Sequence, residues 1–304
     1  MDNLSIPSAL QELSIPNDIG IQFLLKRDDL IHPLLSGNKW RKLKYQIAYA
    51  HEHSYTGILT FGGAYSNHIV ATAVAANTQG LKSIGIIRGE ETSMTNHTLQ
   101  EAIANKMELL FVSRQEYGQK EKGLTVQQYL TDNKEYLLVP EGGKHQLALK
   151  GIGEIVDEIV DENIKQIDYM ICAIGTGTTF AGLANTKHIK HLIGIPVLKH
   201  PTIKDEIEQS FSLNNLDNSC ELIHDYHFGG YAKFDTILID FMHEFYDAYQ
   251  IPTDVVYTSK LMYAVMDLLQ KKYFKPNTTV VIYHSGGLQG NTGMNERFPK
   301  LVRF

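Results

Sequence analysis

Short apolar runs alternate with segments of helical periodicity along most of the chain. Several runs, such as 169–174, are apolar at every position, which is typical of parallel strands covered by helices on both faces. We expect strands at 21–25, 57–61, 83–87, 109–112, 136–139, 168–174, 192–197, 222–226 and 280–283. We expect helices at 69–77, 95–106, 125–130, 148–162, 180–184, 236–249 and 259–272. This alternation predicts an α/β fold with two open, twisted, mostly parallel sheets flanked by helices.

A glycine-rich turn divides the alternation into two sets. The first set ends at Pro140-Glu141-Gly142-Gly143, and the helix at 148–162 leads into the second. We therefore expect two α/β units with a ligand between them, where open sheets usually place one.

Composition narrows the function classes. The 304 residues carry a net charge of -6, which gives no basic field for nucleic acid, so a small-molecule function is favoured. The chain shows no signal-peptide pattern and no run of 18 apolar residues, and its only two cysteines, Cys172 and Cys220, indicate a reducing compartment. We expect a cytoplasmic protein that binds neither membrane nor nucleic acid. No metal site is expected, because the histidines have no third ligand at a recognisable spacing.

The stretch from Ser36 to Tyr45 is the first hint of chemistry. Trp40, Leu43 and two later apolar residues recur at helical spacing, and Ser36-Gly37-Asn38 makes a plausible turn and cap before them. Lys39 then lies in the first turn of a helix, where a cation opposes the helix dipole unless an anion is bound. A desolvated lysine near other cations has a lowered pKa and can react with an aldehyde. A solvated basic helix face is the alternative.

A second glycine-rich turn, Gly175-Thr176-Gly177-Thr178-Thr179, follows a predicted strand and precedes a helix. Its backbone N–H groups and hydroxyls predict a phosphate site. A dinucleotide turn needs an acidic residue after the next strand, and residues 197–200 supply none, so a nucleotide-dependent oxidoreductase is a remote alternative. A simple turn with a helix cap is the other alternative.

Taken together, these motifs resemble the fold-type II pyridoxal-phosphate (PLP) enzymes, which are relatives of the tryptophan synthase β-subunit. Within them the chain is similar to the 1-aminocyclopropane-1-carboxylate (ACC) deaminases and D-cysteine desulfhydrases. The resemblance runs along nearly the whole sequence, through KRDDL at 26–30, SGNKWRKL at 36–43, the Gly-Gly-x-x-Ser-Asn-His turn at 62–68, PEGG at 140–143, GTGTT at 175–179, VYTSK at 256–260 and HSGG at 284–287.

The resemblance implies roles for the residues that hold the cofactor. Lys39 matches the lysine that binds PLP covalently and moves protons, and Lys42 matches a phosphate ligand together with the backbone of 175–179. Asn67 matches the partner of the 3-hydroxyl. Tyr257 matches an aromatic residue near the cofactor ring, and Thr258 matches the residue that faces the pyridine nitrogen.

The resemblance also implies the substrate side of the site. Ser66 matches a substrate contact and is, with Lys39 and Tyr257, a catalytic candidate. Tyr65, Asn67, His68 and Ser285 complete the expected substrate pocket.

Two positions discriminate between the two activities. Cyclopropane-opening relatives carry a glutamate where this chain has Thr258, and an apolar residue where it has Ser285. A threonine is expected to hydrogen-bond a neutral ring nitrogen, which weakens the electron sink and favours loss of a β-thiolate. Tyr65 and Lys144 depart from the family, which usually has glutamine and serine there.

We therefore expect a PLP-dependent lyase acting on a small amino acid, with D-cysteine desulfhydration as the leading activity and ACC deamination as the runner-up. A PLP- or metabolite-binding protein without turnover is the alternative from another class. The resemblance implies a homodimer, with a large PLP-binding domain at 1–45 and 146–304 and a small domain at 46–145.

Overall fold

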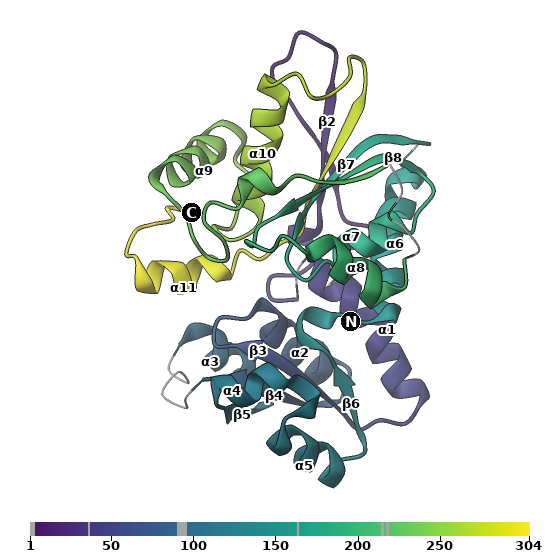
Figure 1. Ribbon diagram of the computed structural model, residues 1–304, viewed down its shortest axis with the longest axis vertical. Helices are drawn as coiled ribbons and strands as arrows, with labels where there is room; N and C mark the ends of the chain where they lie inside the picture. The colour runs from purple at the N-terminus through teal and green to yellow at the C-terminus, as the bar shows by residue number, and fades with distance from the viewer. Residues whose placement is uncertain (1–3, 36, 90–95, 163, 214–215, 217–218) are drawn as a thin grey trace.

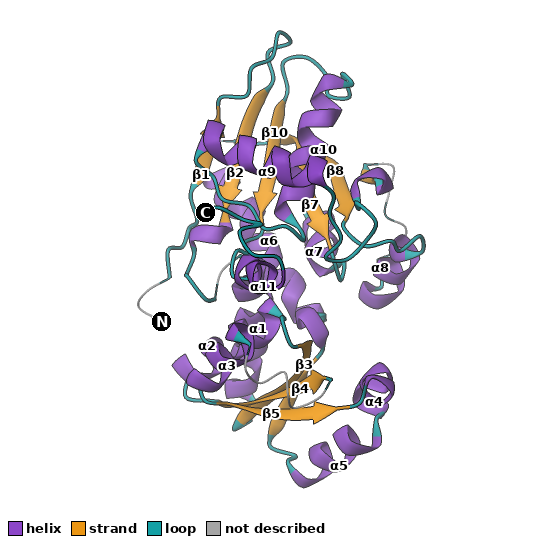
Figure 2. Ribbon diagram, turned by 90° about the vertical axis from the view of Figure 1, so that its left-hand side faces the viewer, coloured by secondary structure: helices purple, strands orange, loops and turns teal. Residues whose placement is uncertain are grey.

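The computed structural model describes residues 4–35, 37–89, 96–162, 164–213, 216 and 219–304. They form two α/β units whose sheets lie at opposite ends of the molecule (Figure 1, Figure 2). Ser36 of the expected cap and Thr95 at the expected start of the helix 95–106 lie outside the described residues. Within these ranges, each helix is too short or too polar to cross a bilayer.

The larger unit is built on a six-stranded sheet that is parallel except at one edge, where β1 runs antiparallel to β2. Its order is β1 (Leu10–Leu13), β2 (Gln22–Arg27), β10 (Thr279–His284), β7 (Ile167–Ile174), β8 (Ile189–Pro196) and β9 (Cys220–Leu222). Successive residues of β7 point to opposite faces, so Ile171 packs with α9 (Thr236–Tyr249) and α10 (Thr258–Gln270), whereas Cys172 packs with the helices of the other face. Those helices are α6 (Gln146–Asp161), α7 (Thr178–Ala184) and α8 (Ile203–Phe211). Both faces are buried, as the uninterrupted apolar runs predict.

The smaller unit has a parallel four-stranded sheet in the order β5 (Met107–Val112), β4 (Lys82–Arg88), β3 (Gly57–Gly63) and β6 (Tyr136–Val139). One face packs against α1 (Asn38–Glu52) and α2 (Asn67–Thr78), with α3 (His97–Ala104) beside α2. The other face packs against α4 (Arg114–Gln119) and α5 (Leu124–Asp132). The expected α/β architecture with two mostly parallel sheets is confirmed.

Helix α1 belongs to both units. Its apolar stripe, Trp40, Leu43, Ile47 and Ala50, is buried in the core of the smaller unit, as the periodicity predicts. Its opposite face packs along α6 of the larger unit, and in Figure 2 α1 lies between the two sheets. The division of the chain at 45 and 146 stays a prediction. Helix α1 contacts both units along its length, so no residue within it separates the contacts with one unit from those with the other.

The prediction of a strand at 222–226 is wrong in position. Strand β9 ends at Leu222, and a 3-10 helix follows at His224–Tyr226. Only three residues pair with β8 at this sheet edge, so the chain leaves the ladder before the apolar run ends. The turn expected before α1 contains its N-cap, since Gly37 is the N-cap residue, and no side chain within the described part of the chain adds a capping hydrogen bond.

Candidate functional site

The start of α1 is fixed against the loop that follows β10. Gly37 has a positive φ of 63°, and a Cβ atom there would lie 1.8 Å from the carbonyl oxygen of Ser285. The backbone N–H of Asn38 donates to that same oxygen at 3.2 Å. Only glycine permits this approach. The first turn of α1, with Lys39, is therefore held beside the His284-Ser285-Gly286-Gly287 loop.

A chain of two hydrogen bonds connects Lys39 with the glycine-rich turn, 140 residues away in sequence. The Lys39 Nζ donates to Asn38 Oδ1 at 2.8 Å, and the Nδ2 of the same asparagine donates to Thr179 Oγ1 at 3.0 Å. The predicted reactive amine and the predicted phosphate site are therefore neighbours. This is the geometry that a single ligand bound to both would require.

The electrostatics of the two lysines favour neutral amines. Burial lowers the pKa of Lys39 to about 8, although the charge of Asp254 acts in the opposite direction. Burial, reinforced by the charge of Lys39, lowers the pKa of Lys42 well below its ordinary value. Within the described part of the chain, no carboxylate forms an ion pair with either ammonium group. An anion bound beside these two groups would favour their protonated forms, so the pair is suited to an anionic ligand.

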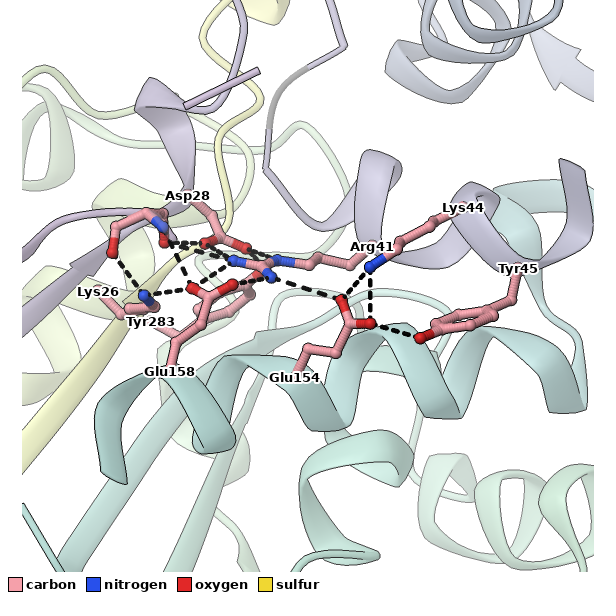
Figure 3. Close-up of polar contacts among 9 residues, drawn as sticks. Lys26, Asp28, Arg41, Lys44, Tyr45, Glu154, Glu158 and Tyr283 are labelled. Carbon is pink, nitrogen blue, oxygen red and sulfur yellow. Dashed lines mark hydrogen bonds and ion pairs between the residues drawn. The ribbon is translucent and has the colours of Figure 1, made fainter. Parts of the chain in front are cut away.

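The adjacent face of α1 carries charges that are fully paired (Figure 3). Arg41 donates to both oxygens of Asp28 at 3.0 Å and to Glu158 at 2.5 and 2.9 Å. Lys26 joins Glu158 at 2.6 Å, and the Tyr283 hydroxyl donates to Asp28 at 2.6 Å. Burial alone would lower the pKa of Arg41, but the two carboxylates raise it above its ordinary value. This Arg41 network joins β2, β10 and α6 to the helix that carries Lys39.

The glycine-rich turn is shaped by close packing. Gly177 has a φ of 80°, and a Cβ atom there would lie 2.3 Å from Cγ1 of Ile207. A Cβ atom on Gly142 would lie 2.9 Å from the Thr176 methyl group, so the 140–143 turn packs against this one. Backbone N–H groups at such a turn have no partner within the following helix, and they are free to bind anion oxygens.

The smaller unit contributes the start of α2. Ser66, Asn67 and His68 line the cavity, and the His68 side chain is buried. Its Nε2 lies 2.8 Å from Thr60 Oγ1, whose single proton is donated to the Val139 carbonyl. The threonine can then only accept, so Nε2 carries the imidazole proton and Nδ1 is an acceptor. Burial and the charges of Lys39 and Lys42 lower the pKa of His68 well below its ordinary value, so the ring is neutral.

The larger unit supplies the opposite wall. The Tyr257 ring packs against the glycine-rich turn, 3.1 Å from where a Cβ atom of Gly175 would lie. The ring of Tyr231 stands at 70° to it, with centroids 6.4 Å apart. Burial and the neighbouring Tyr231 raise the pKa of Tyr257 well above its ordinary value. Tyr257 is therefore a neutral, flat surface.

Most of the predicted site residues line one cavity of about 1090 Å³ between the two units. That volume lies just above the usual range for small-molecule sites, which is about 300–1,000 Å³. The predicted residues on its wall are Lys39, Lys42, Tyr65, Ser66, Asn67, His68, Gly175, Thr176, Gly177, Thr179, Tyr257 and Ser285. Thr178 and Thr258 are fully buried behind the wall.

Tyr231 and Asp254 are among the wall residues that sequence reasoning missed. Tyr231 follows the pair Gly229-Gly230 and lines the cavity. Asp254 is buried, lines the cavity and stands three residues before Tyr257. Neither has a sequence spacing that singles it out, since each reaches the cavity through the packing of its loop.

The two departures from the family pattern lie at the cavity mouth. Lys144 pairs with Glu206 of α8 at 2.6 Å, and His200 contacts the same carboxylate at 3.1 Å. Tyr65 is 41% exposed, and its ring packs against Gly293 of α11 (Gly290–Arg297). Both side chains make contacts between the two units.

Comparison with known proteins agrees with this geometry. A family model described as pyridoxal-phosphate dependent enzyme matches residues 6–286. A "Putative 1-aminocyclopropane-1-carboxylate deaminase" of Pyrococcus abyssi is 28% identical, over 95% of this chain and 91% of the relative. One of the same description from Thermotoga maritima is also 28% identical, over 96% and 97%.

Solved structures share the fold. The crystal structure of an ACC deaminase homologue superposes with a TM-score of 0.83 at 24% identity, covering 99% of this chain and 95% of that one. The structure of a hydrogen sulfide-producing enzyme from Fusobacterium nucleatum gives a TM-score of 0.70 at 14% identity, with 95% and 97% covered.

Proposed function

The chain belongs to the pyridoxal-phosphate dependent enzyme family, and from this premise we propose that it catalyses α,β-elimination on a small amino acid resembling D-cysteine. With one water, the products are pyruvate, ammonia and sulfide. The cofactor is PLP and the enzyme is of the lyase or deaminase type. Because the family consists of enzymes, catalysis is favoured over the alternative of a PLP- or metabolite-binding protein without turnover.

The chemistry of the donor set fits this cofactor. An aldehyde needs a neutral amine, and Lys39 has a pKa lowered to about 8 by burial. A phosphate needs unpaired donors, and Lys42 and the 175–179 turn supply them. The observation that carries the proposal is the hydrogen-bond chain from Lys39 through Asn38 to Thr179, because it brings these two requirements together.

Each wall residue then has a task in the reaction. When bound, PLP supplies an electrophilic carbon and a ring that takes up electrons from the substrate. Asn38 orients the Lys39 amine, which takes the proton from the substrate α-carbon. Lys42 and the turn hold the phosphate, Asn67 holds the 3-hydroxyl, and Tyr257 supports the ring.

The substrate side is formed by α2 and the loop after β10. Ser66 and Ser285 offer hydroxyl donors for a carboxylate, and His68 Nδ1 offers an acceptor. The cavity is open between the two units, and the side chains of Tyr65 and Lys144 lie at its mouth.

ACC deamination is the second candidate. The descriptions of the two curated relatives favour it, since both are named for that activity. It breaks a carbon–carbon bond, releases 2-oxobutanoate rather than pyruvate, and needs a stronger electron sink than thiolate loss.

Cofactor trapping and a substrate panel test the proposal. Borohydride should fix PLP to Lys39, as seen by peptide mass spectrometry, and Lys39→Ala should lose both the adduct and activity. Lys44→Ala is the matched control, because Lys44 lies on the same helix, forms an ion pair with Glu154 and does not line the cavity within the described residues. The purified enzyme should release pyruvate from D-cysteine and β-chloro-D-alanine.

The products decide between the candidates. Release of 2-oxobutanoate from ACC without pyruvate from D-cysteine would replace the first candidate by the second. No 2-oxo acid from either substrate or from L-cysteine would refute both. The homodimer implied by the family resemblance and the cytoplasmic location expected from the composition are also part of the proposal, and light scattering and cell fractionation test them.

A further inference from the structure

A buried ammonium group on α10 bonds to three backbone carbonyls. Lys260 is fully buried, and its Nζ donates to the carbonyl oxygens of His227 at 2.9 Å, Gly230 at 2.8 Å and Val197 at 3.4 Å. An ammonium group has three donors, so each of them has an acceptor. Burial lowers the pKa of Lys260 to about 8, whereas the charge of Asp254 acts in the opposite direction. The charged form, with all three donors, therefore predominates at neutral pH.

Two of these carbonyls begin consecutive turns. The N–H of Gly230 donates to the His227 oxygen at 2.9 Å, and the N–H of Lys233 donates to the Gly230 oxygen at 3.2 Å. Each oxygen therefore accepts once within its own turn and once from Lys260, which occupies both of its lone pairs. Tyr231 is the second residue of the second turn. The ammonium group thus fixes the backbone directly before Tyr231.

The two turns contain backbone conformations that most side chains disfavour. Phe228 and Ala232 have φ values of 50° and 52°, in the left-handed region that residues other than glycine seldom adopt. Such conformations persist only where the surrounding structure enforces them, and they are concentrated at functional sites. The bonds from Lys260 to the first carbonyl of each turn supply part of that support.

The third carbonyl connects the turns with the predicted phosphate site. Val197 directly follows β8, and its N–H donates to the carbonyl oxygen of Ile174 at 3.1 Å. Ile174 is the last residue of β7 and precedes Gly175. Lys260 thereby relates the backbone that carries Tyr231 to the strand end from which the glycine-rich turn begins.

We propose that Lys260 is a positioning residue that holds Tyr231 in the cavity wall through the carbonyls of His227 and Gly230. Tyr231 lines the cavity beside Tyr257 and is 53% exposed. Because about half of this side chain is exposed, packing fixes it only in part, and its place in the wall depends on the backbone that carries it. The consequence for turnover rests on the proposed function, in which Tyr257 supports the cofactor ring.

Steady-state kinetics of the holoenzyme measure the effect on turnover. PLP on Lys39 is first verified by borohydride trapping in each variant, and release of 2-oxo acid is followed with β-chloro-D-alanine and with ACC. Lys260→Met removes all three donors. We expect kcat/KM to fall about 10- to 100-fold, because a displacement of about 1 Å in a site can cost about 100-fold. Lys260→Gln keeps two donors and should lose less.

The matched control is Lys271→Met. Lys271 follows the last residue of α10, forms an ion pair with Asp267 at 2.6 Å and does not line the cavity within the described residues. This variant should leave kcat/KM unchanged.

A double-mutant cycle shows whether Lys260 acts through Tyr231. Tyr231→Ala removes the side chain that is positioned, so Lys260→Met should cause no further loss of kcat/KM in that background. A lysine that serves only the fold would instead lower kcat/KM by the same factor in both backgrounds.

Limited proteolysis reports on the turns without requiring turnover. Lys233 is exposed at the end of the second turn, and Lys122 is exposed in the smaller unit. Cleavage by trypsin after Lys233, relative to cleavage after Lys122, should be about tenfold faster in Lys260→Met than in the wild type, because local opening exposes the turn. Lys260→Gln should give an intermediate rate. Global destabilisation would raise both cleavage rates together.

The outcomes are distinct. Unchanged relative cleavage in a folded Lys260→Met protein overturns the proposal, and so does an equal loss of kcat/KM with and without the Tyr231 side chain. If the methionine variant does not fold, the same two comparisons with Lys260→Gln decide. A wild-type holoenzyme that releases no 2-oxo acid would refute the proposed function and the role in turnover, while the cleavage rates would still decide whether Lys260 holds the turns.

Discussion

Helix α1 buries positive charge in two different ways within one turn. Arg41 points toward α6, where Asp28 and Glu158 accept every strong bond it offers (Figure 3). Lys39 and Lys42 point toward the cavity, where the described residues provide no ion-pair partner. The pKa of Arg41 is raised by its carboxylates, while the pKa values of the two lysines are lowered by burial.

The difference separates structural charge from functional charge. Burying an ion is costly unless it is paired and hydrogen-bonded. The Arg41 network meets that condition with groups of this chain, and it holds the helix to the larger unit. The two lysines have no such partner among the described residues, so burial lowers their pKa values in the apo protein, and a bound anion would stabilise their charged forms. The basic cluster that appeared to oppose the helix dipole in the sequence is thus two clusters with two roles.

Removal of Arg41 from its ion-pair network should have the largest effect on stability. Arg41→Met leaves the buried Asp28 without its cation and Glu158 with only Lys26, and we expect the free energy of unfolding of the apo protein to fall by about 3–5 kcal/mol. Urea denaturation measures this. Lys190→Met, which removes a half-exposed pair with Asp168, is the control and should cost about 0–1 kcal/mol. Equal losses in the two variants would show that the network is not structural.

Substitution of Lys42, on the cavity-facing side of α1, should affect ligand binding instead. Lys42→Met removes a desolvated cation that has no partner until phosphate binds. We expect the apo stability to stay the same or rise, and the Kd for PLP to increase about 10- to 100-fold, as expected for a charged hydrogen bond of about 1.5–3 kcal/mol. Fluorescence titration with PLP gives the affinity. A loss of apo stability as large as that of Arg41→Met, one residue away, would contradict the distinction.

The pH dependence of PLP attachment sharpens the same contrast. Only a neutral amine reacts, and the pKa of Lys39 is lowered from 10.5 to about 8. Stopped-flow absorbance should show the attachment rate rising about tenfold per pH unit below 8 and levelling above it. Between pH 8 and 10.5 the unfolded chain binds more protons at this group, so its contribution to apo stability should increase with pH. A midpoint near 10.5 would mean that the amine is solvated.

Much of the site was predictable because family motifs and glycines mark where the backbone must turn. Lys39, Asn67 and the 175–179 turn were predicted from such signals, and the structure brings all of them to one cavity. The apolar runs predicted the central strands because parallel strands are buried on both faces. The error at 222–226 arose where an edge strand pairs on one side only, so apolar character there reports packing rather than strand length.

The sequence by itself determined the alternation of strands and helices, the apolar face of α1 and the groups that fit the cofactor. These follow from local periodicity and from residues adjacent in the chain. Only the tertiary structure decided which charges are paired, since Arg41 meets Glu158 across 117 residues. It also decided the tautomer of His68, because hydrogen-bond direction depends on which partner competes for a proton. Periodicity carries no information about that competition.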